Sequence, residues 1–418
     1  MANQPALTFG VEVKFFLLPD TGIRGDFHQK TYESMAMIFQ KNLPKPLPTA
    51  VILGKWSKFT GDAYTFPGRH PMEQKDWKYY YCFSGDPSVL ADFTRSMGIV
   101  AEGKGRIGME MATRVLNYDK QGCAEFKAAM NAVMAGGKPW DPRIGSSLIP
   151  SCTPMGGLHV HVGDRGGLKL STAKRVAILG WLLEPCLFSL CSHGRGRNFH
   201  SPARKNSILA AMNFEYAEIN YAKEEEELTK MWSRLYIRDT HHGHQNDDNE
   251  NHIPMYFSRI DRKRIAVLAN ARSMQELETL LSYTNQRTKN RRLCLAIYNR
   301  VNDHTTIEFR HFQGTHDPEL AWEWVRLVTT IVQIASTSTE SEFQKLLREI
   351  SYQYRAMRRR SRDYLIRQAQ KKGAKDPWLD SWTWMLPILN LNEHEPFWSR
   401  YVARLPERNE VEWGGASL

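Results

Sequence analysis

The sequence of 418 residues lacks several patterns that would place it in a familiar class. Its six cysteines include no Cys-x-x-Cys pair, which argues against a disulfide framework and against a zinc finger. The most apolar segment, VAILGWLLEPCLFSLC, is interrupted by Glu184 and Pro185 and is too short to span a bilayer. The N-terminal residues show no basic region followed by a long apolar run, as a signal peptide would. We therefore expect a cytoplasmic protein with reduced cysteines and no membrane association.

Glycine patterns typical of nucleotide binding are also missing, because neither a P-loop nor a Gly-x-Gly-x-x-Gly motif precedes a helical segment. Strand-like and helix-like segments do not alternate regularly, which disfavours a doubly wound parallel sheet. We expect an α+β fold with a largely antiparallel sheet packed by helices. Helices are predicted at residues 125–137, 171–191, 318–336 and 342–373, with Ser171 as the N-cap of the second.

The composition is basic, with 56 lysines and arginines against 45 acidic residues and a formal net charge of +11. Such a balance suits an anionic partner such as a nucleotide, a carboxylate or a nucleic acid. The segment RAMRRRSRDYLIRQ, residues 355–368, carries part of this charge. Its Tyr364, Leu365 and Ile366 do not form the interleaved aromatic platform on which bases stack. Nucleic acid is therefore the less favoured partner.

Residues 156–163, GGLHVHVG, place two histidines in a strand-like setting. Because alternate residues of a strand share a face, His159 and His161 should point one way. The intervening Leu158, Val160 and Val162 should point the other way, into a core. A metal or phosphate site on a sheet would use such a pair, and so would a sheet whose histidines are satisfied by polar neighbours. This motif alone leaves both interpretations open.

Three further strand-like segments carry isolated charges among apolar residues. They are FGVEVKF with Glu12 and Lys14, IGMEMAT with Glu110, and TIEFRHF with Glu308 and Arg310. In the last segment His311 falls on the apolar side with the neighbouring isoleucine and phenylalanine. A charge buried without a partner is costly, so each of these faces is either solvated or mutually paired. Four strands with the same pattern favour one shared polar cavity.

The order of these motifs resembles the amidoligase family, within the carboxylate–amine ligase group that contains glutamine synthetase and glutamate–cysteine ligase. The matching segments, in chain order, are FGVEVKF, YYYCFSGDPS, IGMEMATRVL, GGLHVHVG, GRGRNFHSP and AIYNRVNDHTTIEFRHFQGTHDPE. The resemblance extends over about residues 8–335. Each motif alone is weak, and the specificity lies in the ordered set.

The resemblance implies a reaction and a fold. ATP would phosphorylate a substrate carboxylate, and an amine would attack the acyl phosphate to give an amide, with Mg²⁺ or Mn²⁺ holding the ATP phosphates. The partners would be a small carboxylic acid and an amine, and a homo-oligomer is possible. A curved sheet like that of glutamine synthetase would carry the site within residues 1–336, followed by a C-terminal helical extension, 337–418.

Motif positions also imply residue roles. One metal-binding group would comprise Glu12, His159 and Glu308, and Glu110 would be a ligand of a second ion. Arg310 would stabilise the transferred phosphoryl group, and with Glu308 and Lys14 it forms the catalytic set. Further candidates for nucleotide or substrate binding are His161, Asp86, Ser88, Arg195, Arg197, Asn299 and His311.

One position departs from the family pattern, because Lys14 stands where a second glutamate is expected. A charged ammonium cannot ligate a metal. Three alternatives follow. Lys14 replaces one metal ion as a fixed positive charge, or the second metal ion is bound by Glu110 and water alone. In the third, ATP turnover is lost and the chain is a pseudoenzyme that binds a nucleotide or a partner. A metal-dependent hydrolase is a further alternative. Amidohydrolases carry a His-x-His motif near the start of the chain, and cupins carry a glutamate shortly after theirs. This sequence has neither arrangement.

Overall fold

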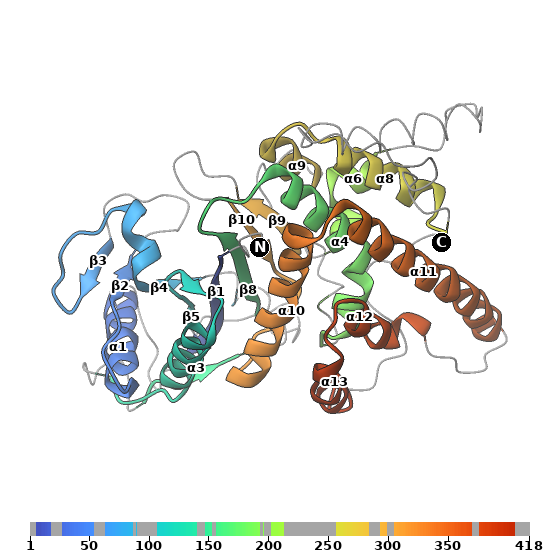
Figure 1. Cartoon of the computed structure of the whole chain (residues 1–418). Coiled ribbons are helices and arrows are strands. Elements are labelled where there is room, and N and C mark those ends of the chain that lie inside the picture. The colour runs from blue at the N-terminus through green and yellow to red at the C-terminus, as the bar shows by residue number, and fades with distance from the viewer. Residues whose placement is uncertain are drawn as a thin grey trace. The chain divides into compact units, whose positions relative to one another are not determined.

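A computed structural model gives the structure of residues 6–17, 27–53, 63–86, 89, 107–139, 147–152, 156–192, 195, 202–212, 256–283, 293–298, 305–369 and 376–405. Within these ranges the protein is α+β, and its ten strands are mixed but largely antiparallel and are packed by helices (Figure 1). This confirms the expected class. The chain divides into two compact units, which are described separately.

The first unit, here the sheet unit, draws on residues 6–163 and 312–329. Its strands run in the order β3-β2-β4-β5-β1-β8, with β6 and β7 paired to β1. The strands are β1 (Leu7–Leu17), β2 (Thr49–Ile52), β3 (Ala63–Phe66), β4 (Tyr81–Gly85), β5 (Ile107–Ala112), β6 (Leu116–Asn117), β7 (Pro150–Ser151) and β8 (Leu158–Asp164, all but its last residue). The β2–β4 pair is parallel, whereas β1 and β4 both pair with β5 in antiparallel fashion.

Strand β1 separates a core face from a polar face. Val11 and Val13 are 1% and 0% exposed, whereas the alternating Glu12 and Lys14 are half-buried on the opposite side. The β1–β5 register sets Lys14 opposite Glu110. The predicted division of this strand into valine and charged faces is therefore confirmed.

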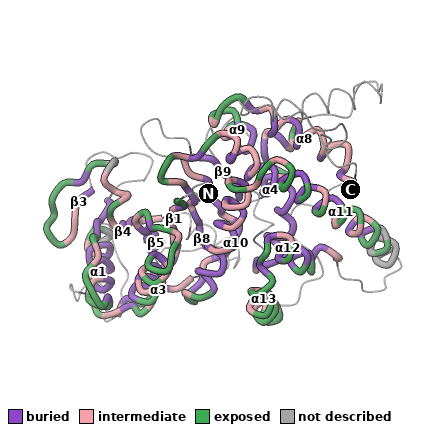
Figure 2. The backbone as a smooth tube through the Cα atoms, viewed as in Figure 1, coloured by how far each residue is buried: buried purple, intermediate pink, exposed green. Residues whose placement is uncertain are grey.

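Two helices, α1 (Phe27–Asn42) and α3 (Lys120–Met134), cover the core face of the sheet unit. The α1 ring of Phe39 packs 5.3 Å from that of Phe83 on β4, and the α3 ring of Phe126 packs 6.0 Å from Phe9 on β1. Helix α3 mixes buried and exposed residues, whereas residues 31–36 of α1 are all buried (Figure 2). A short 3₁₀-helix, η1 (Gln74–Tyr79), precedes β4.

Helix α3 begins earlier than the pattern predicted. The Asp119 side chain accepts a hydrogen bond from the backbone N–H of Gly122 at 2.7 Å and caps the first turn. The helix ends as expected at a glycine pair, where Gly136 adopts a φ of +60°.

The second unit, here the helical unit, draws on residues 164–311 and 330–405 of the described chain. An antiparallel pair, β9 (Leu295–Tyr298) and β10 (Thr306–Phe309), belongs to it. Its helices are α4 (Leu170–Ser189), α5 (Ala203–Asn206), α6 (Ile208–Ala211), α8 (Arg259–Asn270), α9 (Met274–Leu280), the end of α10 (Pro318–Thr337), α11 (Glu340–Ala369), η4 (Pro377–Asp380), α12 (Trp382–Ile388), η5 (Asn392–His394) and α13 (Glu395–Val402).

The start of α4 corrects the prediction that Ser171 is its N-cap. Lys169 holds the N-cap position and makes no side-chain capping hydrogen bond. The backbone N–H of Ala173 donates to the Lys169 carbonyl at 3.0 Å, so the first turn closes before Ser171, which lies inside the helix.

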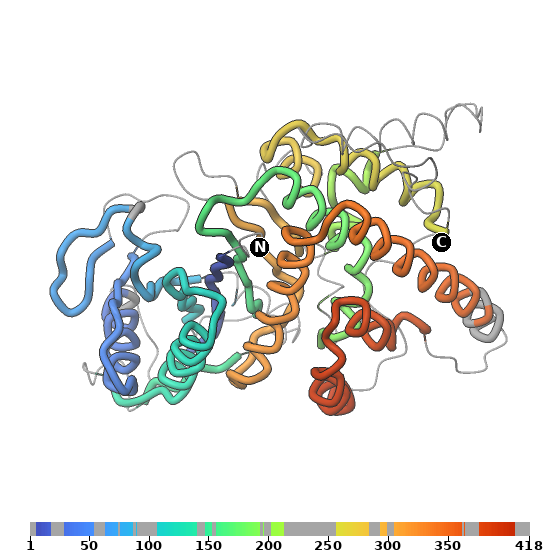
Figure 3. The backbone as a smooth tube through the Cα atoms, in the orientation of Figure 1, coloured from blue at the N-terminus to red at the C-terminus, as the bar shows by residue number. Residues whose placement is uncertain are grey.

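Segments far apart in the sequence pack together in the helical unit, as α4, α11 and α12 show (Figure 3). Buried Arg204 of α5 contacts three other helices: it donates to the Tyr354 hydroxyl of α11 at 2.7 Å and to the Trp181 carbonyl of α4 at 3.2 Å, and it pairs with Asp261 of α8 at 3.0 Å. Tyr354 in turn donates to the Leu182 carbonyl of α4 at 2.6 Å. The C-terminal helices are thus confirmed, whereas a domain boundary after residue 336 stays a prediction. Within the described residues, no helix is long and apolar enough to cross a membrane.

Replacing Gly108 by alanine should lower the free energy of unfolding by about 2 kcal/mol, because its Cβ would lie 2.2 Å from the backbone oxygen of Asp86. Gly10→Ala is the matched control, since its Cβ would meet only Thr113 Oγ1 at 3.9 Å. Urea unfolding of both variants provides the measurement. Equal stability of the two variants would contradict the close approach of β5 to the β4 turn.

Candidate functional site

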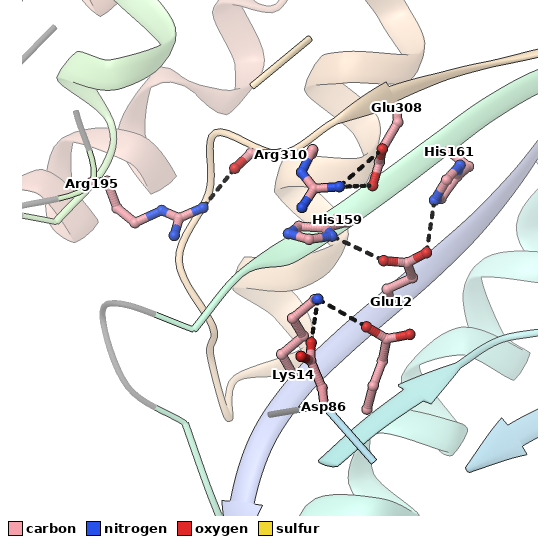
Figure 4. A network of polar contacts seen from close by, with 9 residues as sticks. Glu12, Lys14, Asp86, His159, His161, Arg195, Glu308 and Arg310 are labelled. Carbon is pink, nitrogen blue, oxygen red and sulfur yellow. Dashed lines mark hydrogen bonds and ion pairs between the residues drawn. The ribbon is translucent and has the colours of Figure 1, made fainter. Parts of the chain in front are cut away.

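The polar face of the sheet unit holds Glu12 between two imidazoles. The N–H at Nδ1 of His159 donates to Glu12 Oε2 at 2.9 Å, and that at Nε2 of His161 donates to Oε1 at 3.1 Å (Figure 4). A carboxylate can only accept, so each of these ring nitrogens carries the hydrogen. On the other side of β8, Val160 and Val162 are 0% exposed. The predicted division of β8 is confirmed.

These hydrogen bonds keep Glu12 ionised. Burial by itself raises the pKa of Glu12, but the hydrogen bonds and charges of His159 and His161 outweigh it and hold that pKa well below its usual value. The result is an ionised carboxylate with two imidazoles, all on one face of neighbouring strands β1 and β8. A carboxylate oxygen with imidazole nitrogens is a donor set that Mn²⁺ accepts readily and Mg²⁺ accepts through the oxygen.

Lys14 forms a second cluster on the same face. Its ammonium donates to Asp86 at the end of β4 and, at 3.0 Å, to Glu110 Oε2 on β5 (Figure 4). The side chains of Lys14, Asp86 and Glu110 are only 12%, 13% and 5% exposed. The backbone N–H of Asp86 donates to the Gly108 carbonyl at 2.9 Å and fixes the turn that brings its carboxylate to Lys14.

Glu110 differs from Glu12 in its protonation. Burial raises the pKa of Glu110 to about 8, and the charges of Glu12 and Asp86 add to this effect while Lys14 opposes it. Glu110 therefore holds a proton at neutral pH, and Asp86 balances the charge of Lys14. A second cation at Glu110 would have to displace this proton and compete with the ammonium.

The helical unit holds four of the predicted site residues. Arg310 Nη1 donates to Glu308 Oε1 at 3.0 Å, with Glu308 0% and Arg310 28% exposed (Figure 4). Arg195 donates to the backbone carbonyl oxygens of Arg310 at 2.6 Å and His311 at 3.0 Å. The side chain of Arg195 thus braces the segment that follows β10.

His311 lies in the core of the helical unit, 0% exposed, with its ring 5.1 Å from Phe188 and 6.3 Å from Phe309. Burial, together with the charge of Arg195, lowers the pKa of His311 to about 3, so the ring is neutral. As the alternation predicted, His311 is on the apolar side of its segment. The role in binding nucleotide or substrate stays a prediction.

The structure therefore groups the predicted residues in two sets. The sheet unit gathers Glu12, Lys14, Asp86, Glu110, His159 and His161, and the helical unit holds Arg195, Glu308, Arg310 and His311. Ser88, Arg197 and Asn299 lie outside the described residues.

Two features escaped the sequence interpretation. The sequence predicts Asp86 as a substrate-binding residue, and its pairing with Lys14 depends on the order of strands β4, β5 and β1, which the sequence does not give. Glu184 was considered only as an interruption of an apolar helix, although a carboxylate there requires a buried polar partner. That requirement is a signal that a polar partner exists, and the structure supplies it as backbone N–H groups of α5 and the thiol of Cys294, 3.1 Å away.

Comparison of the chain with protein-family models, with curated proteins and with solved structures finds no match. The family resemblance therefore stays an expectation from the ordered motifs.

The raised pKa of Glu110 predicts a pH-dependent stability. Below pH 4.5, the pKa of the carboxyl group in the unfolded chain, Glu110 is protonated in both the folded and the unfolded state. Between pH 4.5 and about 8, it is protonated only in the folded state. The free energy of unfolding should fall across this window. Glu110→Gln removes the titrating group and should gain stability relative to the wild type as pH rises, by about 5 kcal/mol in total.

Urea unfolding between pH 4 and 9 with a chelator present measures this difference. Glu125→Gln is the control, because Glu125 pairs with Arg114 at 2.6 Å and its pKa is lowered, despite the opposing effect of burial. A difference between Glu110→Gln and the wild type that does not change with pH would show that Glu110 is ionised in the folded protein.

Proposed function

We propose that the chain is an ATP-dependent carboxylate–amine ligase of the amidoligase type, which forms an amide through an acyl phosphate. The observation that carries the proposal is the ionised Glu12, held by His159 and His161, on the sheet face that also bears the ammonium of Lys14. Cation-binding groups beside a fixed positive charge suit a substrate with several phosphate oxygens. The ordered motifs add the family expectation, including a curved, glutamine synthetase-like sheet and a cytoplasmic location.

A divalent cation, Mg²⁺ or Mn²⁺, fits the first cluster. Glu12 would supply an ionised oxygen, and the N–H groups of His159 and His161 hold that carboxylate in place; each imidazole would ligate only through a ring nitrogen that carries no hydrogen. When bound, the cation would screen the charge of the ATP phosphates. The remaining contributions come from the side chains of the chain itself.

Lys14 would take the place of a second cation. Asp86 and Glu110 hold its ammonium in one position, so the charge is fixed at the site in advance of any ligand. A fixed charge aimed at a phosphate oxygen stabilises developing negative charge without reorganisation. Of the three outcomes that the sequence left open for Lys14, this arrangement favours replacement of one metal ion.

Arg310 is the proposed stabiliser of the transferred phosphoryl group. Its guanidinium is anchored on the fully buried Glu308 yet is itself 28% exposed, so it is oriented and still reachable by a ligand. Arginine suits this role because its planar donors match phosphate oxygens.

The same Lys14 cluster supports a second candidate, a pseudoenzyme that binds nucleotide without turnover. Glu110 holds a proton and a hydrogen bond from Lys14, so it offers little to a second cation. If phosphoryl transfer requires two metal ions, this chain would bind the nucleotide without catalysing the transfer.

Hydroxamate formation separates the two candidates. We expect the full chain with ATP, Mg²⁺ and hydroxylamine to yield hydroxamate from at least one member of a panel of carboxylic acids. Glu12→Gln and Arg310→Ala should each reduce the rate at least a hundredfold, on the scale of losing one preorganised charge contact. Glu319→Gln, whose side chain is 60% exposed and bound to Lys127, is the control and should keep wild-type activity.

Nucleotide binding without hydroxamate across the whole panel would favour the pseudoenzyme. Amide hydrolysis that requires metal but no ATP would instead favour the hydrolase.

The role of Lys14 predicts the number of bound ions. Mn²⁺ titration followed by electron paramagnetic resonance should show one ion per chain at the Glu12 cluster in the wild type. Lys14→Glu should bind two, because it replaces the ammonium by a carboxylate beside Asp86 and Glu110. Lys14→Met, which removes the charge without adding a ligand, should still bind one. Two ions in the wild type would refute the replacement.

A further inference from the structure

A further polar cluster lies in the core of the helical unit, beside the segment that carries Arg310. It starts from Glu184, a carboxylate only 1% exposed within the apolar helix α4. Gly180 lies one turn earlier on the same face of α4 and meets β9 so closely that a Cβ would be 2.4 Å from Leu295. Glu184 therefore points at the beginning of β9, where Cys294 precedes Leu295.

The β9–β10 register supplies the third member. Leu295 lies opposite Phe309, and the backbone N–H of Arg310 donates to the Cys294 carbonyl at 2.7 Å, so His311 follows directly beyond Cys294. A carboxylate oxygen of Glu184, the Sγ of Cys294 and a ring nitrogen of His311 all lie within 4.8 Å of one another. Cys294 is 1% and His311 0% exposed.

Hydrogen bonds already hold the carboxylate of Glu184 in place. Its Oε2 accepts from the backbone N–H of Ala203 at 2.7 Å and from the thiol of Cys294 at 3.1 Å, and its Oε1 accepts from the Arg204 N–H at 3.1 Å. A carboxylate has about four acceptor positions, so Oε1 can take a further partner. The thiol proton lies between the sulfur and the carboxylate oxygen, and a metal ion takes its place when a thiol becomes a thiolate ligand.

Two guanidinium groups whose charges act on Glu184 and His311 also have hydrogen-bond partners outside the cluster. The guanidinium of Arg204 pairs with Asp261 at 3.0 Å, and that of Arg195 is turned to the carbonyl oxygens of Arg310 and His311. Ionised Glu184, thiolate Cys294 and neutral His311 together would carry two negative charges, which match one divalent cation. Sulfur, nitrogen and oxygen in one set is the ligand chemistry of zinc.

We propose that Glu184, Cys294 and His311 bind one Zn²⁺ ion, which joins helix α4 to the β9–β10 pair in the core of the helical unit. On binding, a zinc–sulfur bond forms as the S–H bond breaks, and the thiol proton leaves to solvent without any change of oxidation state. The three protein ligands leave one tetrahedral position for a water molecule or another small ligand. The site goes beyond the proposed ligase activity, and His311 is the one ligand that is also a candidate for nucleotide or substrate binding.

Cobalt(II) reports on such a site directly, because a cobalt–thiolate bond gives a charge-transfer absorption band in the near ultraviolet. The full chain is produced in medium supplemented with cobalt and then dialysed. We expect one tightly held cobalt with this band, and production with zinc instead should give one tightly held zinc by elemental analysis. The Glu12 cluster contains no cysteine, so any ion there adds no such band. A folded wild-type chain without the band would overturn the proposal.

Variants identify the ligands. Cys294→Ala should abolish the band and weaken zinc binding roughly a hundredfold or more, and Glu184→Gln should weaken zinc binding while keeping the band. Cys186→Ala is the control, since Cys186 is an equally buried cysteine of α4 outside the cluster, and it should keep both metal and band. Cys294→Ser, which preserves the hydrogen bond to Glu184, replaces Cys294→Ala if circular dichroism shows that the latter is unfolded. A band that survives loss of the Cys294 thiol would overturn the assignment.

Discussion

The pairing of buried charges on the polar face of β1 is the constraint on which the sheet unit depends. An ionised side chain removed from water costs several kcal/mol unless other groups replace its hydration. Glu12 and Lys14 alternate with Val11 and Val13, so the core face cannot pack without bringing both charges to the opposite side of the sheet. The imidazoles of β8 donate hydrogen bonds to Glu12. The ammonium of Lys14 donates to the side chains of Glu110 on β5 and Asp86 after β4. The groups that satisfy these charges are also those suited to hold a cation and a phosphate.

The helical unit meets the same constraint with different means. Arg204 is satisfied by Asp261 and Tyr354 from two other helices, and Glu184 by backbone N–H groups at the start of α5. These contacts are fully enclosed and tie α4, α8 and α11 together, which suits a role in stability. Arg310 is different. Its carboxylate partner, Glu308, is buried, whereas its guanidinium reaches the surface, so the ion pair fixes the orientation of that guanidinium.

Several features of the site followed from the sequence alone. A period of two placed Glu12 with Lys14, and His159 with His161, on single faces, because residues two apart in a strand point the same way whatever the strand packs against. The main helices followed from their apolar patterns, and the α+β class from strand-like and helix-like segments that do not alternate regularly. The start of α4 did not, since a helix end depends on where the first backbone hydrogen bond closes, and Lys169 holds that position without a capping side chain.

The sequence by itself therefore determined the local geometry: which residues share a face, and which segments form strands and helices. Only the tertiary structure decided which faces meet. That Lys14 neutralises Asp86 while Glu110 holds a proton depends on strand order and register, and on the backbone hydrogen bond from Asp86 to Gly108 of β5. The meeting of Glu184, Cys294 and His311 depends likewise on how α4 packs against β9. Charge state and ligand geometry are properties of such long-range contacts, because burial and neighbouring charges set them, and neither is encoded in the spacing of residues along the chain.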